Sequence, residues 1–537
     1  MSYKAYIMTD VPPACAAHDH PPVEKERIMK CVWAGLSLGA GILTAVSAPA
    51  AGQTAAQKPN FLIFIADDAG WNDIGAYGNP AVQTPNIDRL AREGMRFDKA
   101  WLTCSSCSPS RAGILTGRYP HSTGCGELHL PWPEDAVLMS TPLRGAGYWA
   151  ASVGKWHPWG DAGRVQYDFV EDSVPSGCEL WLDALKNRPK DKPFFLWCAA
   201  HDAHRPFMPK TFDPPNSPDK VIVPPYLPDG PETRGELAMY YDEISRMDTG
   251  IGKVLAELQR EGILDTTFIL FLSDNGSPFP RCKTRVYDSG VRTPFIVRYP
   301  KLVRPGSHTA SLVSSVDIAP TILALAGLPP LPGFQGKSFL PLFSNPSATI
   351  RKYAYAEHNW HALAACERAV RSDRFNYIHN WRPDLSAVPP AGAIEKSAVW
   401  TVMKKLYDEG KLPPEQSACF AVPQPVEELY DTQTDPFELH NLAGDPEYAP
   451  VLEQMRNAME KWQKDTKDEF DPMKITSDSF SRETGEKLPE SPWPHPGAKP
   501  EKFKYPVQMK KFERSTTRIF VPEPSSEKRP RDSGCGR

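Results

Sequence analysis

Residues 104 to 118 read Cys-Ser-Ser-Cys-Ser-Pro-Ser-Arg-Ala-Gly-Ile-Leu-Thr-Gly-Arg. Pro109 has a fixed φ and no N–H, so it suits the first helical position, and Gly117 is typical of a helix end. The stretch therefore predicts a helix that begins beside Cys107. Because a helix N-terminus presents unpaired N–H groups and a positive dipole, it favours an anionic group there. Arg111, one turn further on, is expected to face the same way.

Cys104 and Cys107 also form a Cys-x-x-Cys pair, which can serve as a redox or metal-binding motif. A redox pair of this kind lies in a thioredoxin-like context, and a zinc site needs a second ligand pair at a suitable spacing. The sequence offers neither context. The redox or metal pair remains the weaker alternative.

The amino-acid composition excludes few classes of protein. The chain has 537 residues, of which 41% are hydrophobic, enough for one large core and a smaller second one. A net charge of −4 gives no sign of nucleic-acid binding. The 57 prolines indicate long connecting loops on a scaffold. Nine cysteines follow residue 51, and their spacing does not reveal any disulfide pairing.

The N-terminal region contains an export signal by pattern. Met29 and Lys30 precede an apolar run at 31–46 and then small residues at 47–51. This predicts a signal peptide at 29–50 and a periplasmic or secreted protein, with residues 1–28 as an extension before the true start. A membrane anchor is the alternative, but about 16 apolar residues are few for a span. Nothing later is long enough to cross a bilayer.

Four apolar runs, at 61–66, 148–153, 193–199 and 268–272, resemble strands buried on both faces of a largely parallel sheet. Each run ends in polar residues. Because open α/β sheets place their sites at the carboxyl ends of strands, these side chains are expected to meet. They are Asp67 and Asp68, Lys155 and His157, His201 and His204, and Asp274 and Asn275.

Each loop is ambiguous by itself. Asp67 and Asp68 would repel each other unless a cation lay between them, although an Asp-Asp-Ala-Gly turn exposed to solvent is the alternative. His201 and His204 could bind zinc, but no third nitrogen or sulfur ligand is nearby. Lys155 and His157 share a face in an extended chain, or are simply solvated.

The remaining elements complete an α/β prediction. Helices are expected at 84–94, at 316–328 and, as one or two helices, at 232–262, where a core stripe recurs at helical spacing. The stripe comprises Leu237, Tyr241, Ile244, Met247, Ile251, Val254 and Leu258. A fifth strand is expected at 295–297.

The chain beyond residue 350 looks like a second unit. Segments at 353–356, 369–371 and 376–378 alternate as antiparallel strands, and a helix is expected at about 448–465. We therefore predict a large domain at 59–345 with a mostly parallel central sheet flanked by helices, a smaller α+β domain at 350–468, and a Pro/Lys-rich tail at 470–537.

The pattern Cys107-x-Pro-x-Arg followed by Leu-Thr-Gly-Arg resembles the signature of type I sulfatases, of the alkaline-phosphatase-like superfamily. The resemblance extends over about 59–468. In that family the cysteine becomes formylglycine, whose hydrate is the nucleophile, so a formylglycine-generating enzyme is an implied partner. The sulfamidase branch is the most similar one. That similarity rests on three segments, 105–111, Asp274-Asn275-Gly276 with Pro278-Phe279-Pro280, and Glu428-Leu429-Tyr430-Asp431.

The resemblance implies one calcium ion held by Asp67, Asp68, Asp274, Asn275 and the formylglycine made from Cys107. All-oxygen ligation fits calcium better than zinc. The family further implies that Arg111 and Lys155 hold the modified side chain and the sulfate. His157 would take a proton from the second hydroxyl of the hydrate. His204 and Lys283 would contact the sulfate, and His204 would protonate the leaving atom.

Other positions bear on the substrate. Glu357, His358 and His361 lie where the second domain could reach the sugar, or they are ordinary surface polar groups. The sequence also departs from the sulfamidase pattern, which typically has lysine at Trp156, proline at Ala203 and arginine at Lys283. Lysine is a point charge and not a planar fork, so a different orientation of the sulfate stays open.

We therefore expect an exported, calcium-dependent sulfatase, with an N-sulfated glucosamine of a heparan-type glycan as the favoured substrate. The alternatives are an O-sulfatase on another glycan, or a phosphodiesterase or phosphonate hydrolase of the same superfamily. A further alternative is a non-catalytic glycan-binding protein in which Cys107 stays unconverted, for example as a disulfide with Cys104. A glycan-binding protein is disfavoured, because it does not need the full set of Asp67, Asp68, Asp274, Asn275, Lys155 and His157. The sequence does not determine the oligomeric state, and a homo-oligomer is one of the states left open.

Overall fold

The computed structural model describes residues 58–157, 160–388 and 397–492. The predicted extension at 1–28 and signal peptide at 29–50 lie outside these residues. Among the described helices, none combines the length and the apolar character needed to cross a membrane.

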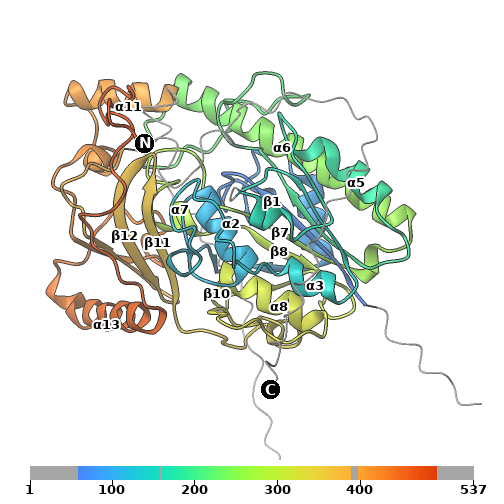
Figure 1. Cartoon of the computed structure of the whole chain (residues 1–537). Coiled ribbons are helices and arrows are strands. Elements are labelled where there is room, and N and C mark those ends of the chain that lie inside the picture. Colours follow the sequence, from blue (N-terminus) through green and yellow to red (C-terminus); the bar gives the residue numbers. More distant parts are fainter. Residues whose placement is uncertain (1–57, 158–159, 389–396, 493–537) are drawn as a thin grey trace, which may run out of the picture. The chain divides into compact units, whose positions relative to one another are not determined.

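An eight-stranded sheet forms the centre of the fold, in the order β5-β4-β6-β1-β7-β8-β2-β9 (Figure 1). The five strands from β5 to β7 are parallel, and β8 runs antiparallel to both of its neighbours. The predicted mostly parallel sheet is therefore confirmed. Its strands are β1 (Asn60–Ala66), β2 (Met95–Phe97), β4 (Trp149–Gly154), β5 (Phe169–Glu171), β6 (Phe194–Ala199), β7 (Thr267–Ser273), β8 (Phe295–Arg298) and β9 (Ser307–Thr309).

Strand β1 shows why the apolar runs are continuous. Its seven residues are all buried. Side chains of successive residues point to opposite faces, so Phe61 and Ile63 enter one core while Leu62 and Phe64 enter the other. Both cores are closed by helices (Figure 1). One holds α2 (Cys107–Thr116), α3 (Ser140–Gly145) and α8 (Ile318–Leu325), and the other holds α1 (Pro85–Glu93), α5 (Trp181–Asn187) and α6 (Pro231–Arg260).

The region predicted as one or two helices is the single helix α6, of 30 residues. All seven residues of its predicted core stripe are buried, with at most 2% of each side chain exposed. The stripe packs in the same core as Leu62 and Phe64 of β1. A hydrophobic stripe of this length needs a partner surface along the whole helix, which the sheet supplies.

A second, antiparallel sheet follows in the order β11-β12-β13-β14 (Figure 1). Its strands are β11 (Ala354–His361), β12 (Leu363–Arg371), β13 (Phe375–Asn380) and β14 (Glu427–Asp431). Three were expected, whereas β14 was not recognised as a strand. Helix α13 (Ala449–Thr466) covers one face through Leu452, Met455 and Met459. The boundaries at 59–345 and 350–468 remain predictions.

Shorter elements complete the described chain. The strands β3 (Ala100–Trp101) and β10 (Val313–Ser314) form a small parallel pair, and helix α11 (Ala398–Asp408) packs in the core that contains α6. The other short helices are α4 (Asp161–Arg164), α7 (Asp288–Val291), α9 (Pro341–Ser344) and α12 (Pro414–Ser417).

The first part of the predicted tail is attached to the second sheet. The Ser479 N–H donates to the Ala362 carbonyl oxygen at 2.8 Å, and the Trp360 indole N–H donates to the Ser477 carbonyl oxygen at 2.9 Å. Residues 470–492 therefore lie against the turn between β11 and β12. The remainder of the tail, from 493 onward, is outside the described residues.

Candidate active site

Helix α2 begins at Cys107, and all ten of its residues are buried. We predicted Pro109 as the first residue of the helix, but it is the third. The position is tolerated because the first four N–H groups of a helix have no partner inside the helix. The helix ends at Gly117, which has a φ of +66° and donates its N–H to the Gly113 carbonyl at 2.9 Å. Cys107 is thereby placed at the loop-to-helix junction.

Asp67 and Asp68 follow β1 and are fully buried. One ligand atom from each, together with the Cys107 sulfur, forms a group whose members lie within 4.8 Å of one another. Asp68 has a φ of +63°, a strained conformation for a residue other than glycine. Its backbone N–H donates to Asp274 Oδ1 at 3.2 Å. The strain thus occurs where two carboxylates converge on the cysteine.

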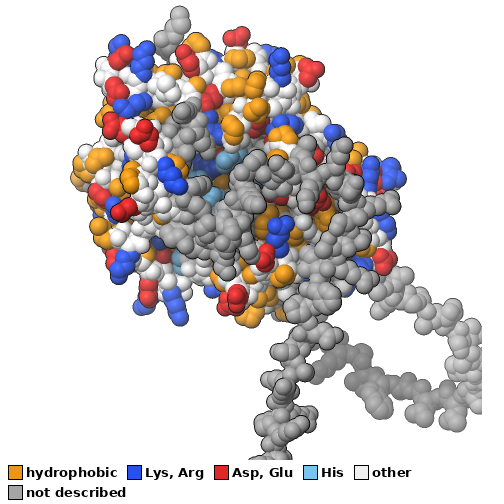
Figure 2. Space-filling view, turned by 45° about the horizontal axis from the view of Figure 1, so that its top comes forward, with side chains coloured by type: hydrophobic (Ala, Val, Ile, Leu, Met, Phe, Trp, Pro, Cys, Tyr) orange, Lys and Arg blue, Asp and Glu red, His pale blue; other side chains and the backbone are white. Residues whose placement is uncertain are grey.

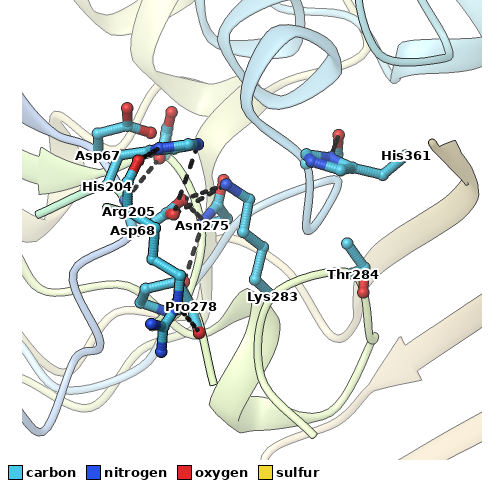
Figure 3. Close-up of polar contacts among 12 residues, drawn as sticks. Asp67, Asp68, His204, Arg205, Asn275, Pro278, Lys283, Thr284 and His361 are labelled. Carbon is cyan, nitrogen blue, oxygen red and sulfur yellow. Dashed lines mark hydrogen bonds and ion pairs between the residues drawn. The ribbon is translucent and has the colours of Figure 1, made fainter. Parts of the chain in front are cut away.

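Asp274 and Asn275 follow β7, the strand beside β1, and both are fully buried. Asn275 Nδ2 donates to Asp68 Oδ1 at 2.6 Å (Figure 3). Burial raises the pKa of Asp274 to about 6; Arg111 opposes the rise, and the neighbouring charges of Asp67 and Asp68 add to it. The carboxylates are therefore crowded at this edge of the sheet.

Two oxygens at this edge indicate a cation site. Among the described residues, Asp67 Oδ1 and Asn275 Oδ1 are buried without a hydrogen-bond partner. An unsatisfied buried polar atom costs roughly 1–3 kcal/mol, and a bound cation would satisfy both. Carboxylate and amide oxygens are hard ligands that suit calcium better than zinc. The residues present therefore fit a calcium ion.

Three cationic side chains pair with these carboxylates, and they are Arg111, Lys155 and Lys283. Lys155 forms an ion pair with Asp67, and Lys283 Nζ lies 2.8 Å from the Asp68 carboxylate (Figure 3). Burial alone would raise the pKa of Asp67, but Lys155 and other nearby positive charges hold it well below its usual range. Positive charge thus gathers around Cys107, as an anionic substrate requires.

Glycine at residue 154 allows Lys155 to reach Asp67. Gly154 has a φ of +91°, and a Cβ there would lie 1.8 Å from the Ala199 carbonyl oxygen. The backbone of β4 therefore approaches β6 closely just before the lysine. A residue with a side chain cannot occupy this position without moving one strand.

Two histidines face the same centre. Burial, with the charges of Lys155 and His129, lowers the pKa of His157 well below its usual value, so its imidazole is neutral and can accept a proton. His204 Nδ1 donates to the Arg205 carbonyl at 2.6 Å, which directs Nε2 toward Asp68, 4.0 Å away (Figure 3). On the surface, histidine, lysine and arginine side chains gather at the floor of a hollow (Figure 2).

Comparison with known proteins identifies the family. A family model described as Sulfatase matches residues 59–171 and 177–328, and one described as N-sulphoglucosamine sulphohydrolase, C-terminal, matches 282–386. Human N-sulphoglucosamine sulphohydrolase is 31% identical over 483 residues, which cover 77% of this chain and 91% of that protein. The chain belongs to the sulfatase family. It is therefore a hydrolase.

Two further relatives of this sulfatase are informative. An ulvan-active sulfatase of Formosa agariphila is 32% identical over 458 residues, which cover 76% of this chain and 75% of that protein. A structure solved in complex with its substrate D-glucosamine-2-N,6-O-disulfate has a TM-score of 0.60 at 22% identity, and covers 78% of this chain and 100% of that chain. The latter likeness supports the fold alone.

The three substrate residues predicted in this sulfatase face different ways. His358 and His361 both line a pocket at the site, and His361 Nδ1 lies 2.7 Å from the Ser106 Oγ. Glu357 instead accepts the His121 N–H at 2.7 Å on the other face of β11. A register shift between His358 and Trp360 turns His361 to the face of His358, as β-bulges do near active sites.

Two alternatives from the sequence find no support among the described residues of the sulfatase. They are a zinc site at His201 and His204, and a redox or metal pair of Cys104 and Cys107. His201 Nε2 lies 2.8 Å from Asp172 Oδ1, and no group of metal-capable side chains in the described chain includes His201 or His204. Cys104 and Cys107 are both free and buried, and Cys104 is absent from the group that contains Cys107. Burial raises the pKa of the Cys107 thiol to about 12.

Sequence reasoning missed several residues at the site. The His129 ring lies 5.3 Å from the His157 ring, and the His129 backbone N–H donates to Ser108 Oγ at 2.9 Å. Nothing in its Gly- and Pro-rich loop marks it. Arg285 and Glu367 were missed as well, although a glutamate in a mostly apolar strand was an available signal.

Proposed function

We propose that this sulfatase is calcium-dependent and removes sulfate from a sulfated glycan, with formylglycine made from Cys107 as the nucleophilic group. The observation that carries the proposal is the position of Cys107, at the N-terminus of a buried helix with ligand atoms of Asp67 and Asp68 within 4.8 Å. Formylglycine supplies a hydrated aldehyde, whose hydroxyl can attack sulfur where a protonated thiol cannot.

The calcium ion would be held by oxygens from Asp67, Asp68, Asp274, Asn275 and the converted Cys107. Bound there, it would offset the negative charge of the sulfate oxygens. The unsatisfied Asp67 Oδ1 and Asn275 Oδ1 support this assignment. The conversion of Cys107 further requires a formylglycine-generating enzyme as a maturation partner, and the export signal at 29–50 stays part of the proposal.

The side chains around Cys107 have separate roles in the proposed reaction. Arg111, Lys155 and Lys283 orient the sulfate and replace its hydration, which stabilises the charge that builds in the transition state. His157, neutral because it is buried beside Lys155, would accept a proton from the second hydroxyl of the sulfated hydrate, which expels sulfate and restores the aldehyde. His204, in its doubly protonated form, would donate its Nε2 proton to the leaving nitrogen or oxygen and keep the Nδ1 proton that it shares with the Arg205 carbonyl.

We favour N-sulfoglucosamine of a heparan-type glycan as the substrate. Support comes from the human relative and from the second family model, which spans Lys283, His358 and His361. The second candidate is an O-sulfate on another glycan. It is favoured by the ulvan-active relative and by Lys283, because a lysine orients sulfate less strictly than the arginine expected in sulfamidases.

The deciding experiment measures the mass of the Cys107 peptide from protein made in its own host, and then sulfate release from N-sulfoglucosamine. Formylglycine is lighter than cysteine, so the two species are distinct. Aldehyde with sulfate release supports the whole proposal. If the aldehyde is present but no sulfate is released from N-sulfoglucosamine, the substrate assignment falls and O-sulfated sugars become the favoured substrates. Unmodified cysteine in native material would overturn it in favour of a glycan-binding protein, and faster turnover of aryl phosphates than of aryl sulfates would favour the phosphodiesterase alternative.

A further inference from the structure

A row of three polar residues crosses the second sheet. His358 on β11 is the direct partner of Glu367 on β12, which is in turn the partner of Asn380 on β13. Directly opposed residues of neighbouring strands project on the same face. The adjacent row, from Glu357 through Arg368 to His379, projects on the other face, where Arg368 binds Asp468 at 2.6 Å.

The row of His358, Glu367 and Asn380 faces the active site. Glu367 forms an ion pair of 2.5 Å with Arg285, two residues beyond Lys283. One pocket is lined by Arg285 and by the three residues of the row, together with Thr284 and His361. Thr284 and His361 lie on the side of Lys283 away from Asp67 and Asp68 (Figure 3). The pocket therefore lies beside Lys283, which contacts the sulfate in the proposed function, and is not part of the metal site.

The polar atoms of this pocket are buried and incompletely bonded. His358 is 2% exposed and Glu367 is 1% exposed. Within the described part of the chain, His358 Nδ1 and Arg285 Nε make no hydrogen bond. Each such atom destabilises the folded protein unless a ligand or water satisfies it. Two of them at one pocket, beside an aligned carboxylate, indicate a polar ligand.

The charges at the pocket indicate which ligand group binds. Glu367 balances Arg285. Two further arginines lining the pocket already have carboxylate partners, since Arg382 lies 2.7 Å from Asp384 and Arg482 lies 2.6 Å from Asp478. No uncompensated positive charge remains among these residues to attract a second sulfate or a carboxylate. Donors from arginine and amide groups, beside carboxylate and imidazole acceptors, instead suit hydroxyl groups.

We propose that His358, Glu367, Asn380 and Arg285 form the subsite that recognises the ring hydroxyls of the sugar that carries the sulfate. This inference rests on the proposed function, and it adds the residues that select the sugar. A site built to hydrogen-bond hydroxyls discriminates strongly, because its buried groups are left unpaired by a substrate that lacks them.

The test compares two substrates in the variants His358→Ala and Glu367→Gln. One substrate is N-sulfoglucosamine, or a glucosamine O-sulfate if only that is hydrolysed. The other is nitrophenyl sulfate, which has no sugar hydroxyls. We expect kcat/KM for the sugar to fall about 10-fold to 100-fold, as for loss of one or two buried hydrogen bonds. Turnover of nitrophenyl sulfate should change less than about 3-fold, which also shows that the variants are folded.

His379→Ala is the matched control, because His379 lies on β13 next to Asn380 but on the opposite face. This variant should leave the turnover of both substrates unchanged. Equal losses on both substrates in the His358 and Glu367 variants, or no loss on the sugar, would overturn the subsite. A loss confined to doubly sulfated sugars would overturn it in favour of an anion-binding pocket. If the wild-type enzyme hydrolysed neither sulfate, the proposed function itself would fall, and this inference with it.

Discussion

Arg111 Nε lies 2.7 Å from Asp274 Oδ2, and both side chains are fully buried. The ion pair joins helix α2, which begins with Cys107, to the end of β7, which supplies Asp274. Arg111 Nη2 also lies 3.8 Å from Asp67 Oδ1. One guanidinium group thus holds helix α2 against two of the proposed calcium ligands.

Replacing Arg111 should damage both stability and activity. Arg111→Ala leaves the Asp274 carboxylate buried without its partner, which costs about 3–5 kcal/mol of unfolding free energy. Arg111→Lys keeps a charge but cannot contact both carboxylates, so activity should fall about 100-fold with a smaller stability loss. Urea unfolding and nitrophenyl sulfate turnover measure the two effects. Arg89→Ala removes a half-buried pair with Glu93 and should cost less than about 1 kcal/mol. An equal cost at both arginines would contradict the prediction.

Calcium removal should lower both the melting temperature and activity. Without the ion, Asp67, Asp68 and Asp274 repel one another in a buried site, and two oxygens lack partners. Dialysis against a chelator, followed by metal analysis and calorimetry, measures the change. Added calcium should restore both properties, whereas zinc should not. Full activity in protein shown to be metal-free would refute the calcium assignment.

Cys107→Ala should abolish turnover while the fold and sugar binding stay close to those of the wild type. The substitution removes the group that is converted to formylglycine, and alanine is tolerated well at a helix start inside a packed core. Sulfate release measures the loss of turnover, and calorimetry measures whether the fold is retained. Substantial residual hydrolysis would show that another group is the nucleophile.

Gly154→Ala should destabilise the protein by about 2 kcal/mol or more, because its φ of +91° and the 1.8 Å approach to the Ala199 carbonyl leave no room for a Cβ. Activity should fall further than stability, since Lys155 is displaced with the backbone. Gly145→Ala is the control. A Cβ at Gly145 meets nothing within 4 Å, so its effect should stay within about 1 kcal/mol. Equal effects at the two glycines would exclude this explanation.

Acid should remove one surface contribution to stability. Burial would raise the pKa of Glu261, but hydrogen bonds from Arg188 and Lys190 lower it to about 2 in the folded protein. A lowered folded pKa stabilises the protein above the unfolded pKa of about 4.3, and the gain is lost as pH falls from there toward 2. The stability difference between wild type and Glu261→Gln should therefore be constant above about pH 5.5 and shrink below pH 4.5. Urea midpoints at several pH values test this, and a difference that grew with acid would contradict it.

The local patterns predicted much of the centre of the fold. Strand β1 was recognisable because a strand covered on both faces is apolar at every position. Asp67, Asp68, Asp274 and Asn275 could be grouped because adjacent parallel strands end at one edge. Strand β14 was missed because its five residues carry three acidic groups, Glu427, Glu428 and Asp431, and only pairing with β13 identifies them as a strand.

The sequence by itself determined the buried strands, the helix that begins at Cys107 and the family, because each depends on short contiguous motifs. Tertiary structure alone decided which face each polar residue of the second sheet occupies. Glu357 and His358 are neighbours in sequence but point to opposite faces, and the register shift before Trp360 turns His361 toward the site. Arg285 pairs with Glu367, which lies far from it in the sequence. Register, bulges and long-range pairs arise from strand pairing and packing, which no local pattern specifies.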